Sequence, residues 1–269
     1  MTASGFVFRK AKRLLGEVAA LAVLTSLASF AAAQPKPTLE YIFDKSKDNL
    51  TTFGGIIDHS GNKFNGTELS GGTETSFVPG HLSGTTAVLF LGDDDPNSSS
   101  GEPGVGTAID TGALTSDVKM DNQSWTVMAW INRTCFKEDQ MVFGSGAGSG
   151  SYLHLGFRRG LAYFGTWNGD SSAYVGNLVG VYEWHHYALR YDAVKKTHSI
   201  FVDGAPILNE PGAVFPGYGT NLLIGGNYGY AGNGAGCFAG AIEHPRVYGG
   251  QALRDDQIAA DSNDNPIPP

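Results

Sequence analysis

Hydrophobic and polar residues alternate along much of the chain, in short segments that end at clusters of Gly, Pro, Asn, Asp and Ser. Successive side chains of a β-strand point to opposite faces, so this alternation predicts strands with one buried face. The predicted strands are residues 39–44, 86–91, 125–131, 141–143, 152–157, 161–166, 184–191, 198–202, 205–208, 221–224 and 238–248. Many short strands separated by turns indicate an all-β chain that folds as a two-sheet antiparallel β-sandwich.

Three local signals refine this pattern. Asp203 and Gly204 lie between two predicted strands, and this dipeptide strongly favours a tight β-hairpin. Pro245 interrupts the last predicted strand, which indicates an edge or bulged position because proline has no backbone N–H. Residues 251–260 have the pattern of a short C-terminal helix.

The N-terminal segment has the pattern of an export signal. Basic residues gather at positions 9–13, residues 18–30 are apolar, and three alanines follow at 31–33. This order predicts a secretory signal peptide over residues 1–33, followed by a single domain over residues 34–269. A membrane anchor is the alternative, but the apolar run is shorter than the roughly 20 residues that a span needs. We therefore expect a secreted, periplasmic or cell-surface protein with no membrane span in the mature chain.

Composition narrows the class of partner. The 269 residues include 38 glycines, and charged residues make up only 16% of the chain, against about 25% in an average domain. The glycines follow no three-residue period, which excludes collagen, and the low charge excludes a coiled coil. The net charge of −8 argues against nucleic acid as a partner.

Several segments together resemble one family. They are YIFD at 41–44, DHSGNKFNG at 58–66, GTTAVLFLGDDD at 84–95, SWTVMAWI at 124–131, EWHHYALRYD at 183–192, IFVDGAPI at 200–207 and FAGAIEHPRVYGGQALRDDQI at 238–258. In this order they resemble the LamG-like domains of the concanavalin A-like lectin/glucanase superfamily. The resemblance implies a jelly-roll sandwich whose function is open, because this fold hosts lectins, hydrolases, lyases and adhesive modules.

The sequence departs from that family at two places. The family more often has Asp, an acidic residue and Val where this chain has Glu243, His244 and Pro245. Residues 96–106 form an additional loop rich in Pro, Ser and Gly.

Catalytic motifs are missing from the sequence. Laminarinase-like enzymes of the superfamily carry two catalytic carboxylates on one strand as E-x-D-x-x-E, and no Glu here is followed by Asp two residues later. A retaining glycosidase needs two carboxyl groups about 5 Å apart. Glu138, Asp139 and Glu183 are the candidates for such a pair from separate strands, and solvated surface acids are the simpler interpretation. We therefore predict no catalytic residue.

Acidic turns point to a structural calcium ion. Calcium takes six to eight oxygen ligands from carboxylates and backbone carbonyls. In relatives of this fold a calcium ion ties the first strand to the closing strand, and Asp44 and Glu243 lie in those two segments. The predicted ligands are Asp44, Asp58, Asp93 and Glu243. Each Asp can instead be a turn former that accepts backbone hydrogen bonds.

Aromatic residues in polar loops suggest a sugar-binding platform, since sugars stack on exposed rings. The predicted ligand-binding residues are Trp167, Asn168, Asp170, Tyr174, Tyr228 and Tyr230. Loop aromatics that only cover the rim of the sheets are the alternative. Trp125, Trp130 and Trp184 lie within alternating strand patterns and are assigned to the core.

One pair of cysteines and one pair of histidines allow further predictions. Cys135 and Cys237 are the only cysteines, and in an oxidising compartment they predict one disulfide, with two buried thiols as the alternative. His185 and His186 are adjacent in a predicted strand, so they should point to opposite faces and cannot chelate one metal ion together.

These observations predict a secreted, non-catalytic recognition module that binds an extracellular glycan or a surface protein. Carbohydrate binding is the first interpretation, because of the loop aromatics. A structural or adhesive protein is the second, and a glycoside hydrolase or polysaccharide lyase is the third.

Overall fold

The computed structural model describes residues 33–69, 75–92, 107–135, 139–146, 152–166, 169–174, 179–226 and 236–269. Residues 1–32 hold almost all of the predicted signal peptide and lie outside this part of the chain, so that prediction is not tested. Within the described residues, no helix is long and apolar enough to cross a membrane.

The first sheet has eight strands, and we call it the β16 sheet. They are β1 (Leu39–Glu40), β3 (Ser76–Pro79), β4 (Thr86–Phe90), β6 (Trp125–Arg133), β11 (Trp184–Asp192), β12 (Thr197–Val202), β13 (Ala205–Pro211) and β16 (Gly240–Gly249). Their order across the sheet is β13-β12-β11-β6-β16-β4-β3, and β1 also pairs with β16. The closing strand therefore lies in the interior of the sheet, between β6 and β4.

The second sheet also has eight strands, and we call it the β8 sheet. They are β2 (Thr67–Glu68), β5 (Ile109–Leu114), β7 (Gln140–Ser145), β8 (Leu153–Arg158), β9 (Leu161–Gly165), β10 (Ser171–Tyr174), β14 (Asn221–Ile224) and β15 (Gly236–Cys237). Their order is β10-β9-β8-β7-β14-β5-β2, with β15 pairing β7. Apart from the β15–β7 ladder, the strands of both sheets pair antiparallel. The predicted two-sheet sandwich is confirmed.

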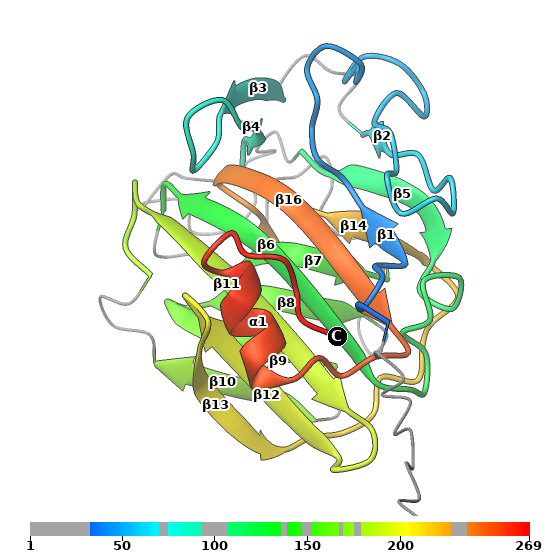
Figure 1. Cartoon of the computed structure of the whole chain (residues 1–269), viewed down its shortest axis with the longest axis vertical. Helices are drawn as coiled ribbons and strands as arrows, with labels where there is room; N and C mark the ends of the chain where they lie inside the picture. Colours follow the sequence, from blue (N-terminus) through cyan, green and yellow to red (C-terminus); the bar gives the residue numbers. More distant parts are fainter. Residues whose placement is uncertain are drawn as a thin grey trace, which may run out of the picture. The chain divides into compact units, whose positions relative to one another are not determined.

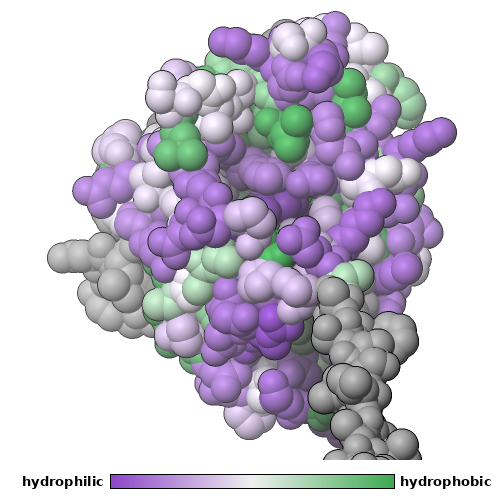
Figure 2. All heavy atoms as spheres, in the orientation of Figure 1, coloured by the Kyte–Doolittle hydropathy of each residue, from purple (hydrophilic) through white to green (hydrophobic). Residues whose placement is uncertain are grey.

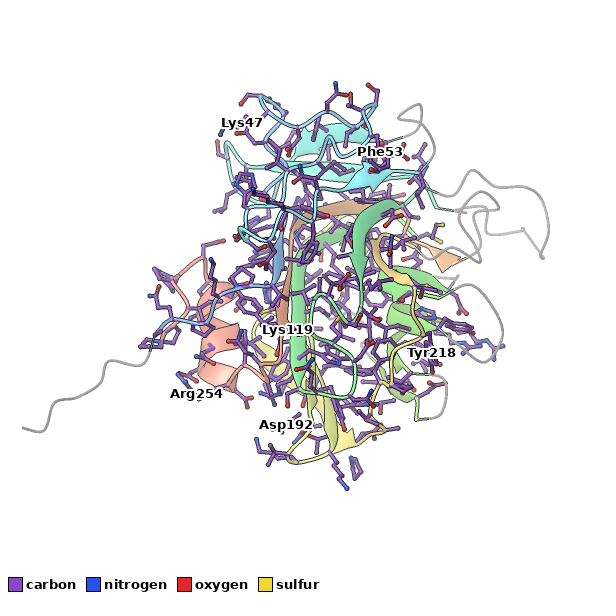
Figure 3. The ribbon with its side chains drawn as sticks, turned by 90° about the vertical axis from the view of Figure 1, so that its right-hand side faces the viewer. Lys47, Phe53, Lys119, Asp192, Tyr218 and Arg254 are labelled. Carbon is purple, nitrogen blue, oxygen red and sulfur yellow. The ribbon has the colours of Figure 1, made fainter. Side chains whose placement is uncertain are left out.

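Alternate residues of the strands fill the space between the two sheets (Figure 3). Trp125 of β6 is fully buried and stacks on Phe164 of β9, with ring centroids 5.1 Å apart. Phe157 of β8 stacks on Tyr187 of β11 at 4.9 Å. Burial of a large apolar side chain contributes about 1.5–3 kcal/mol, so these contacts between sheets hold the sandwich together. The assignment of Trp125 to the core is confirmed.

The helix α1 (Asp255–Asp261) lies across the outer face of the β16 sheet (Figure 1). A second apolar cluster joins them, formed by Met128, Ala188, Phe201, Tyr248, Leu253 and Ile258. The helix begins later than the predicted residue 251, because the preceding segment is held on β6 by Thr126. The Thr126 hydroxyl donates to the Gln251 carbonyl oxygen (3.1 Å) and accepts from the Leu253 N–H (3.0 Å).

The strand β16 contains the irregularity that Pro245 predicts. Its register with β6 shifts between Glu243 and Arg246, and His244 has a positive φ of 48°. The position is a bulge and not an edge, since β16 has neighbours on both sides. A bulge re-aims the side chains around it, and here it lies at the departure from the family pattern.

The hairpin between β12 and β13 is also confirmed. Asp203 and Gly204 both have positive φ, of 49° and 76°. A two-residue turn of this kind matches the twist of the flanking strands, and it needs residues that tolerate left-handed backbone.

Two kinds of prediction were wrong or incomplete. Trp130 and Trp184 point away from the core and are only partly buried. They lie two residues from Met128 of β6 and His186 of β11, on the same outward-facing side of each strand. The strands β2, β3, β5, β10 and β15 were not predicted. Gly112 interrupts the pattern of β5, and β3 lies at the edge of its sheet with two exposed residues.

The structure does not show the predicted disulfide, which stays a prediction. Cys135 and Cys237 both lie within the described residues and are buried. Burial raises the pKa of the Cys237 thiol to about 12, which keeps it protonated and poorly reactive.

Candidate functional site

The outer face of the β8 sheet carries a polar group that includes a predicted ligand-binding residue. The Tyr163 hydroxyl accepts a hydrogen bond from Arg158 Nη1 (3.0 Å) and donates one to Asp170 Oδ2 (2.6 Å). Asp139 Oδ2 lies 3.3 Å from Arg158 Nε. We call Asp139, Arg158, Tyr163 and Asp170 the Arg158 cluster. It joins residues of β8 and β9 with the residues just before β7 and β10 in one chain of contacts.

Strand alternation and one glycine create this cluster. Leu155 and Phe157 point into the core, so His154 and Arg158 point outward from β8. Tyr163 pairs with Gly156, between these two residues, and its ring contacts both: His154 at 4.8 Å and the Arg158 guanidinium carbon at 5.3 Å. Gly165 leaves room for the ring, since a Cβ there would lie 2.4 Å from a Tyr163 ring carbon.

Burial differs across the cluster. Arg158 and Asp139 are 38% and 37% exposed, while Tyr163 is only 7% exposed. Burial, and then the hydrogen bond to Asp170, raises the pKa of Tyr163, so its hydroxyl stays protonated. The hydrogen bond to Tyr163 raises the pKa of Arg158. The cluster therefore presents a fixed donor and acceptor set with one charged end open to solvent.

The other predicted ligand-binding residues cannot be placed in the same way. Tyr174 is the last residue of β10 and pairs with Leu161 of β9. Trp167, Asn168, Tyr228 and Tyr230 lie outside the described residues. Asp170 is thus the one member of the predicted platform whose contacts are described.

The predicted calcium ligands that the structure describes, Asp44, Asp58 and Glu243, have protein partners. Asp58 accepts hydrogen bonds from the backbone N–H groups of Glu40 (3.1 Å), Ser60 (2.9 Å) and Phe64 (3.0 Å) and from the Ser60 hydroxyl (2.8 Å). These contacts make it a turn former that ties the loop to β1. Among the described residues, no three His, Cys, Asp or Glu side chains form a group that could hold a metal ion.

Asp44 and Glu243 do approach each other, as the family resemblance implies. Both line a cavity of about 340 Å³ beside β4 and β16. However, Asp44 is bonded to Ser46 and Lys47, and Glu243 to His81. These residues do not fit a calcium site without rearrangement, and Asp93 lies outside the described residues. Calcium binding stays a prediction.

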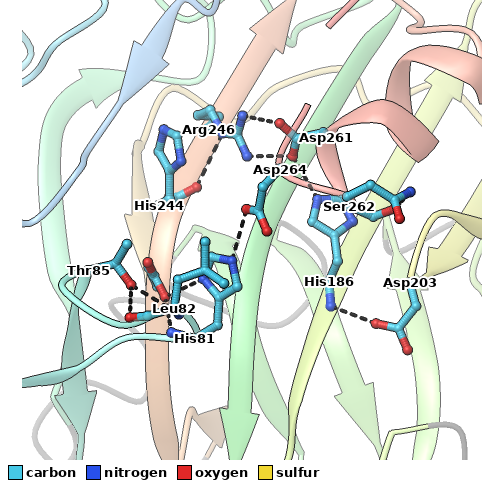
Figure 4. A network of polar contacts seen from close by, with 12 residues as sticks. His81, Leu82, Thr85, His186, Asp203, His244, Arg246, Asp261, Ser262 and Asp264 are labelled. Carbon is cyan, nitrogen blue, oxygen red and sulfur yellow. Dashed lines mark hydrogen bonds and ion pairs between the residues drawn. The ribbon is translucent and has the colours of Figure 1, made fainter. Parts of the chain in front are cut away.

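A larger polar network lies on the outer face of the β16 sheet (Figure 4). Arg246 of β16 binds both carboxylate oxygens of Asp261, and His186 Nε2 of β11 lies 2.8 Å from Asp261 Oδ2. Burial alone would raise the pKa of Asp261, but the hydrogen bond from His186 and the charge of Arg246 hold it well below its usual range. Asp261 is 7% exposed, so α1 ends on a buried, fully paired carboxylate.

His81 extends this network toward the β3–β4 connection. Its Nδ1 lies 2.8 Å from Glu243 Oε2, and its Nε2 lies 2.9 Å from Asp264 Oδ1. Its ring stacks on Trp130, with centroids 4.0 Å apart and planes 13° apart. Trp184 meets the His81 ring edge-on at 6.4 Å. Two tryptophans assigned to the core therefore form an aromatic group on the outer surface.

His244 lies at the bulge, between two cavities. It lines the 340 Å³ cavity and also a second one of about 380 Å³. Its Nε2 lies 2.8 Å from Glu40 Oε1, and this hydrogen bond lowers the pKa of Glu40. Figure 2 shows this face of the molecule, where mostly hydrophilic residues surround a hollow over β16.

The adjacent histidines behave as predicted. His186 points to the outer face and is fully buried under the C-terminal segment, whereas His185 points the other way and contacts Asp203 at 2.9 Å. The hydrogen bond with Asp203 raises the pKa of His185. Sequence reasoning missed His81, Asp261 and Asp264, and the only signal near them was the departure from the family pattern at Glu243–Pro245.

Two acids considered for catalysis have ordinary partners. Asp139 pairs with Arg158, and Glu183 is 70% exposed with one oxygen 3.7 Å from His185 Nε2. Glu138 lies outside the described residues.

The chain thus folds as a jelly-roll sandwich with one polar cluster on each outer face. The chain belongs to the concanavalin A-like lectin/glucanases superfamily, since the model of that family matches residues 104–259, more than half of the chain. The resemblance seen in the sequence is therefore confirmed. A search of curated proteins finds no match.

Solved structures with the same fold include binding domains. Domain 4 of AbnA, an extracellular arabinanase from Geobacillus stearothermophilus in complex with arabinotriose, is 17% identical, with a TM-score of 0.57. The alignment covers 86% of this chain and 99% of that domain.

Two toxin domains are similar at lower identity. The binding domain of Paraclostridial Mosquitocidal Protein 1 is 13% identical with a TM-score of 0.54, and the alignment covers 85% of this chain and 52% of that one. The binding domain of Botulinum neurotoxin DC, in complex with rat synaptotagmin II, is 12% identical with a TM-score of 0.53 and the same coverage. At these identities the likeness shows the fold alone.

Proposed function

We propose that this protein is a carbohydrate-binding module and that it binds sugar at the outer face of the β8 sheet. The observation that carries the proposal is the Arg158 cluster. It places a charged donor, a buried hydroxyl and a carboxylate in one row beside an aromatic ring.

This chemistry suits a sugar. Sugar hydroxyls both donate and accept hydrogen bonds. A cluster whose donors and acceptors are already fixed loses little side-chain entropy when it binds them. Asp139 pairs with the single cation Arg158, and Asp170 adds a second carboxylate to the cluster, so the cluster disfavours an anionic ligand. Trp167 and Asn168 lie three and two residues before Asp170 in the sequence, which supports a ring for stacking nearby.

The comparisons give further support. A domain of the same fold is known in complex with arabinotriose, so neutral arabinose-containing polysaccharides are the first ligands to test. Protein receptors are the second candidate, since another domain of this fold is known in complex with synaptotagmin.

The test is a binding titration with matched variants. We expect Asp170→Asn and Tyr163→Phe each to weaken binding of arabinan or another retained polysaccharide about tenfold, because each removes one hydrogen bond to a charged group. Asp256→Asn is the control, since Asp256 is 59% exposed on α1, on the other sheet. Equal affinity of all three variants and the wild type would refute the proposed site.

Two further predictions concern the setting of this function. We propose that residues 1–33 direct export, which N-terminal sequencing of the protein from culture medium or periplasm would test. A catalytic function stays the alternative, and release of reducing ends or unsaturated sugars by the purified protein would establish it.

A further inference from the structure

The 380 Å³ cavity on the outer face of the β16 sheet has the features of a ligand site. Its volume lies in the range of known ligand pockets, about 300–1,000 Å³. Trp130, Arg246 and Tyr248 line it from the sheet, while Asn265 and Gln34 line it from the two ends of the described chain. Three segments that are distant in sequence therefore converge on one hollow.

The C-terminal segment that lines the cavity is held in place by several contacts. Gln257 Nε2 donates to the Pro268 carbonyl oxygen (2.7 Å), and Arg254 Nη2 donates to that of Pro269 (2.8 Å). Ile267 packs against the second apolar cluster. The segment after α1 is thus attached to the helix on one side and to the sheet on the other, and the cavity is built before any ligand enters.

Every charged residue that lines the cavity is already paired. Arg246 is bound to Asp261 through both carboxylate oxygens. Asp264 contacts His81 at 2.9 Å, and His244 contacts Glu40 at 2.8 Å. An ionic ligand would have to break one of these pairs and leave its partner uncompensated. The cavity therefore favours a neutral ligand.

The groups that remain for binding are an aromatic ring and two amides. His81 stacks on Trp130 and fixes the orientation of the indole ring. The side-chain amides of Gln34 and Asn265 have no hydrogen-bond partner in the part of the chain that the structure describes. An amide offers both donors and an acceptor, and an indole offers flat apolar area. Together they match the hydroxyl edge and the C–H face of a sugar ring.

We propose that this cavity is a second, separate binding site for a neutral saccharide of one or two rings. The proposal does not rest on the Arg158 cluster, because the two sites use opposite outer faces of the sandwich. In Figure 3, α1 with Arg254 lies on one side of the sandwich, and Tyr218, which donates to the carbonyl oxygen of Thr166 next to the Arg158 cluster, lies on the other.

The experiment titrates the mature chain with glucose, galactose, arabinose and their β-linked disaccharides, followed by tryptophan fluorescence and saturation-transfer NMR. Asn265→Leu fills the cavity entrance from an exposed position and removes the amide. Trp130→Phe reduces the aromatic area on which a sugar ring can stack. Asp256→Asn, at an exposed position of α1, serves as the matched control, and Asp170→Asn reports separately on the other face. Circular dichroism confirms that each variant is folded.

We expect at least one neutral sugar to bind the wild type and Asp256→Asn with equal affinity. Asn265→Leu should abolish this binding, and Trp130→Phe should weaken it about tenfold. Loss of binding in Asp170→Asn alone would assign the sugar to the Arg158 cluster and overturn the second site. No binding of any neutral sugar at millimolar concentration, or tighter binding of glucuronate than of glucose, would overturn it as well.

Discussion

The two outer faces of the sandwich carry polar clusters of opposite character. On the β16 sheet, Asp261 is 7% exposed and is shared by Arg246 and His186. On the β8 sheet, Arg158 and Asp139 are each more than a third exposed and form a single contact of 3.3 Å. The first cluster lies under α1 and the C-terminal segment, and the second has a solvent-facing end.

This difference separates structural charges from charges that a ligand can use. A buried ion pair is costly to break, because one partner is left charged in a poorly solvated place. An exposed pair contributes little to stability and exchanges its partner easily. We therefore expect substitutions of the paired charges on the β16 face to act first on folding, and substitutions in the Arg158 cluster to act first on binding.

The largest expected effect is that of Asp261→Ala. It leaves Arg246 and His186 buried without their shared carboxylate, and we expect the free energy of unfolding to fall by about 3–5 kcal/mol. Urea unfolding measured by circular dichroism tests this. Asp256→Asn on the same helix, 59% exposed, should change the free energy of unfolding far less. Equal losses in the two variants would show that the two faces do not differ in the way we describe.

The second effect is a pH dependence of the free energy of unfolding that comes from His154, whose ring contacts Tyr163 of the Arg158 cluster. Burial lowers the pKa of His154 from its ordinary 6.5 to about 4. Above pH 6.5 the imidazole is neutral in both states. As the pH falls from 6.5 to 4, only the unfolded chain takes up the proton, so stability falls, by about 3 kcal/mol in total.

The His154→Gln variant tests this pH dependence. Its unfolding free energy should change less than that of the wild type between pH 6.5 and 4, and the two curves should run parallel above pH 6.5. Parallel curves over the whole range would contradict the buried, neutral state of His154.

The third effect concerns the Tyr163 hydroxyl. Tyr163→Phe removes the link between Arg158 and Asp170, and we expect a loss of about 1 kcal/mol in stability. Sugar binding should weaken more clearly than folding. If the variant unfolds far more easily but each folded molecule keeps its sugar affinity, Tyr163 contributes to stability and not to binding.

The smallest effect is expected for Asp139→Asn. The pair with Arg158 is exposed, and its loss should change the free energy of unfolding by about 0.2–1 kcal/mol. Added salt should reduce even this difference, because exposed charges are screened. A loss above about 2 kcal/mol in thermal or urea unfolding would contradict the contrast between the faces.

Much of the architecture was predictable because it depends on local pattern. The alternation in residues 125–131 and 184–191 correctly predicted two central strands, and Asp203-Gly204 predicted the hairpin. Pro245 predicted the bulge, since a residue without an N–H cannot continue the ladder. Of the candidate sites, Asp170 was placed in a polar cluster, although its partners Arg158 and Tyr163 were not foreseen.

The amino-acid sequence by itself determined the sandwich, its order of strands along the chain and which side chains share a face, because these follow from neighbours a few residues apart. Only the tertiary structure decided which face each set occupies and what covers it. Trp130 fits a core strand as well as an outer surface, and His81 meets Asp264 across 183 residues of sequence. Contacts between residues so far apart produce no local sequence pattern. The paired network and the cavity beside it therefore depend on how the sheets pack, and only the tertiary structure shows them.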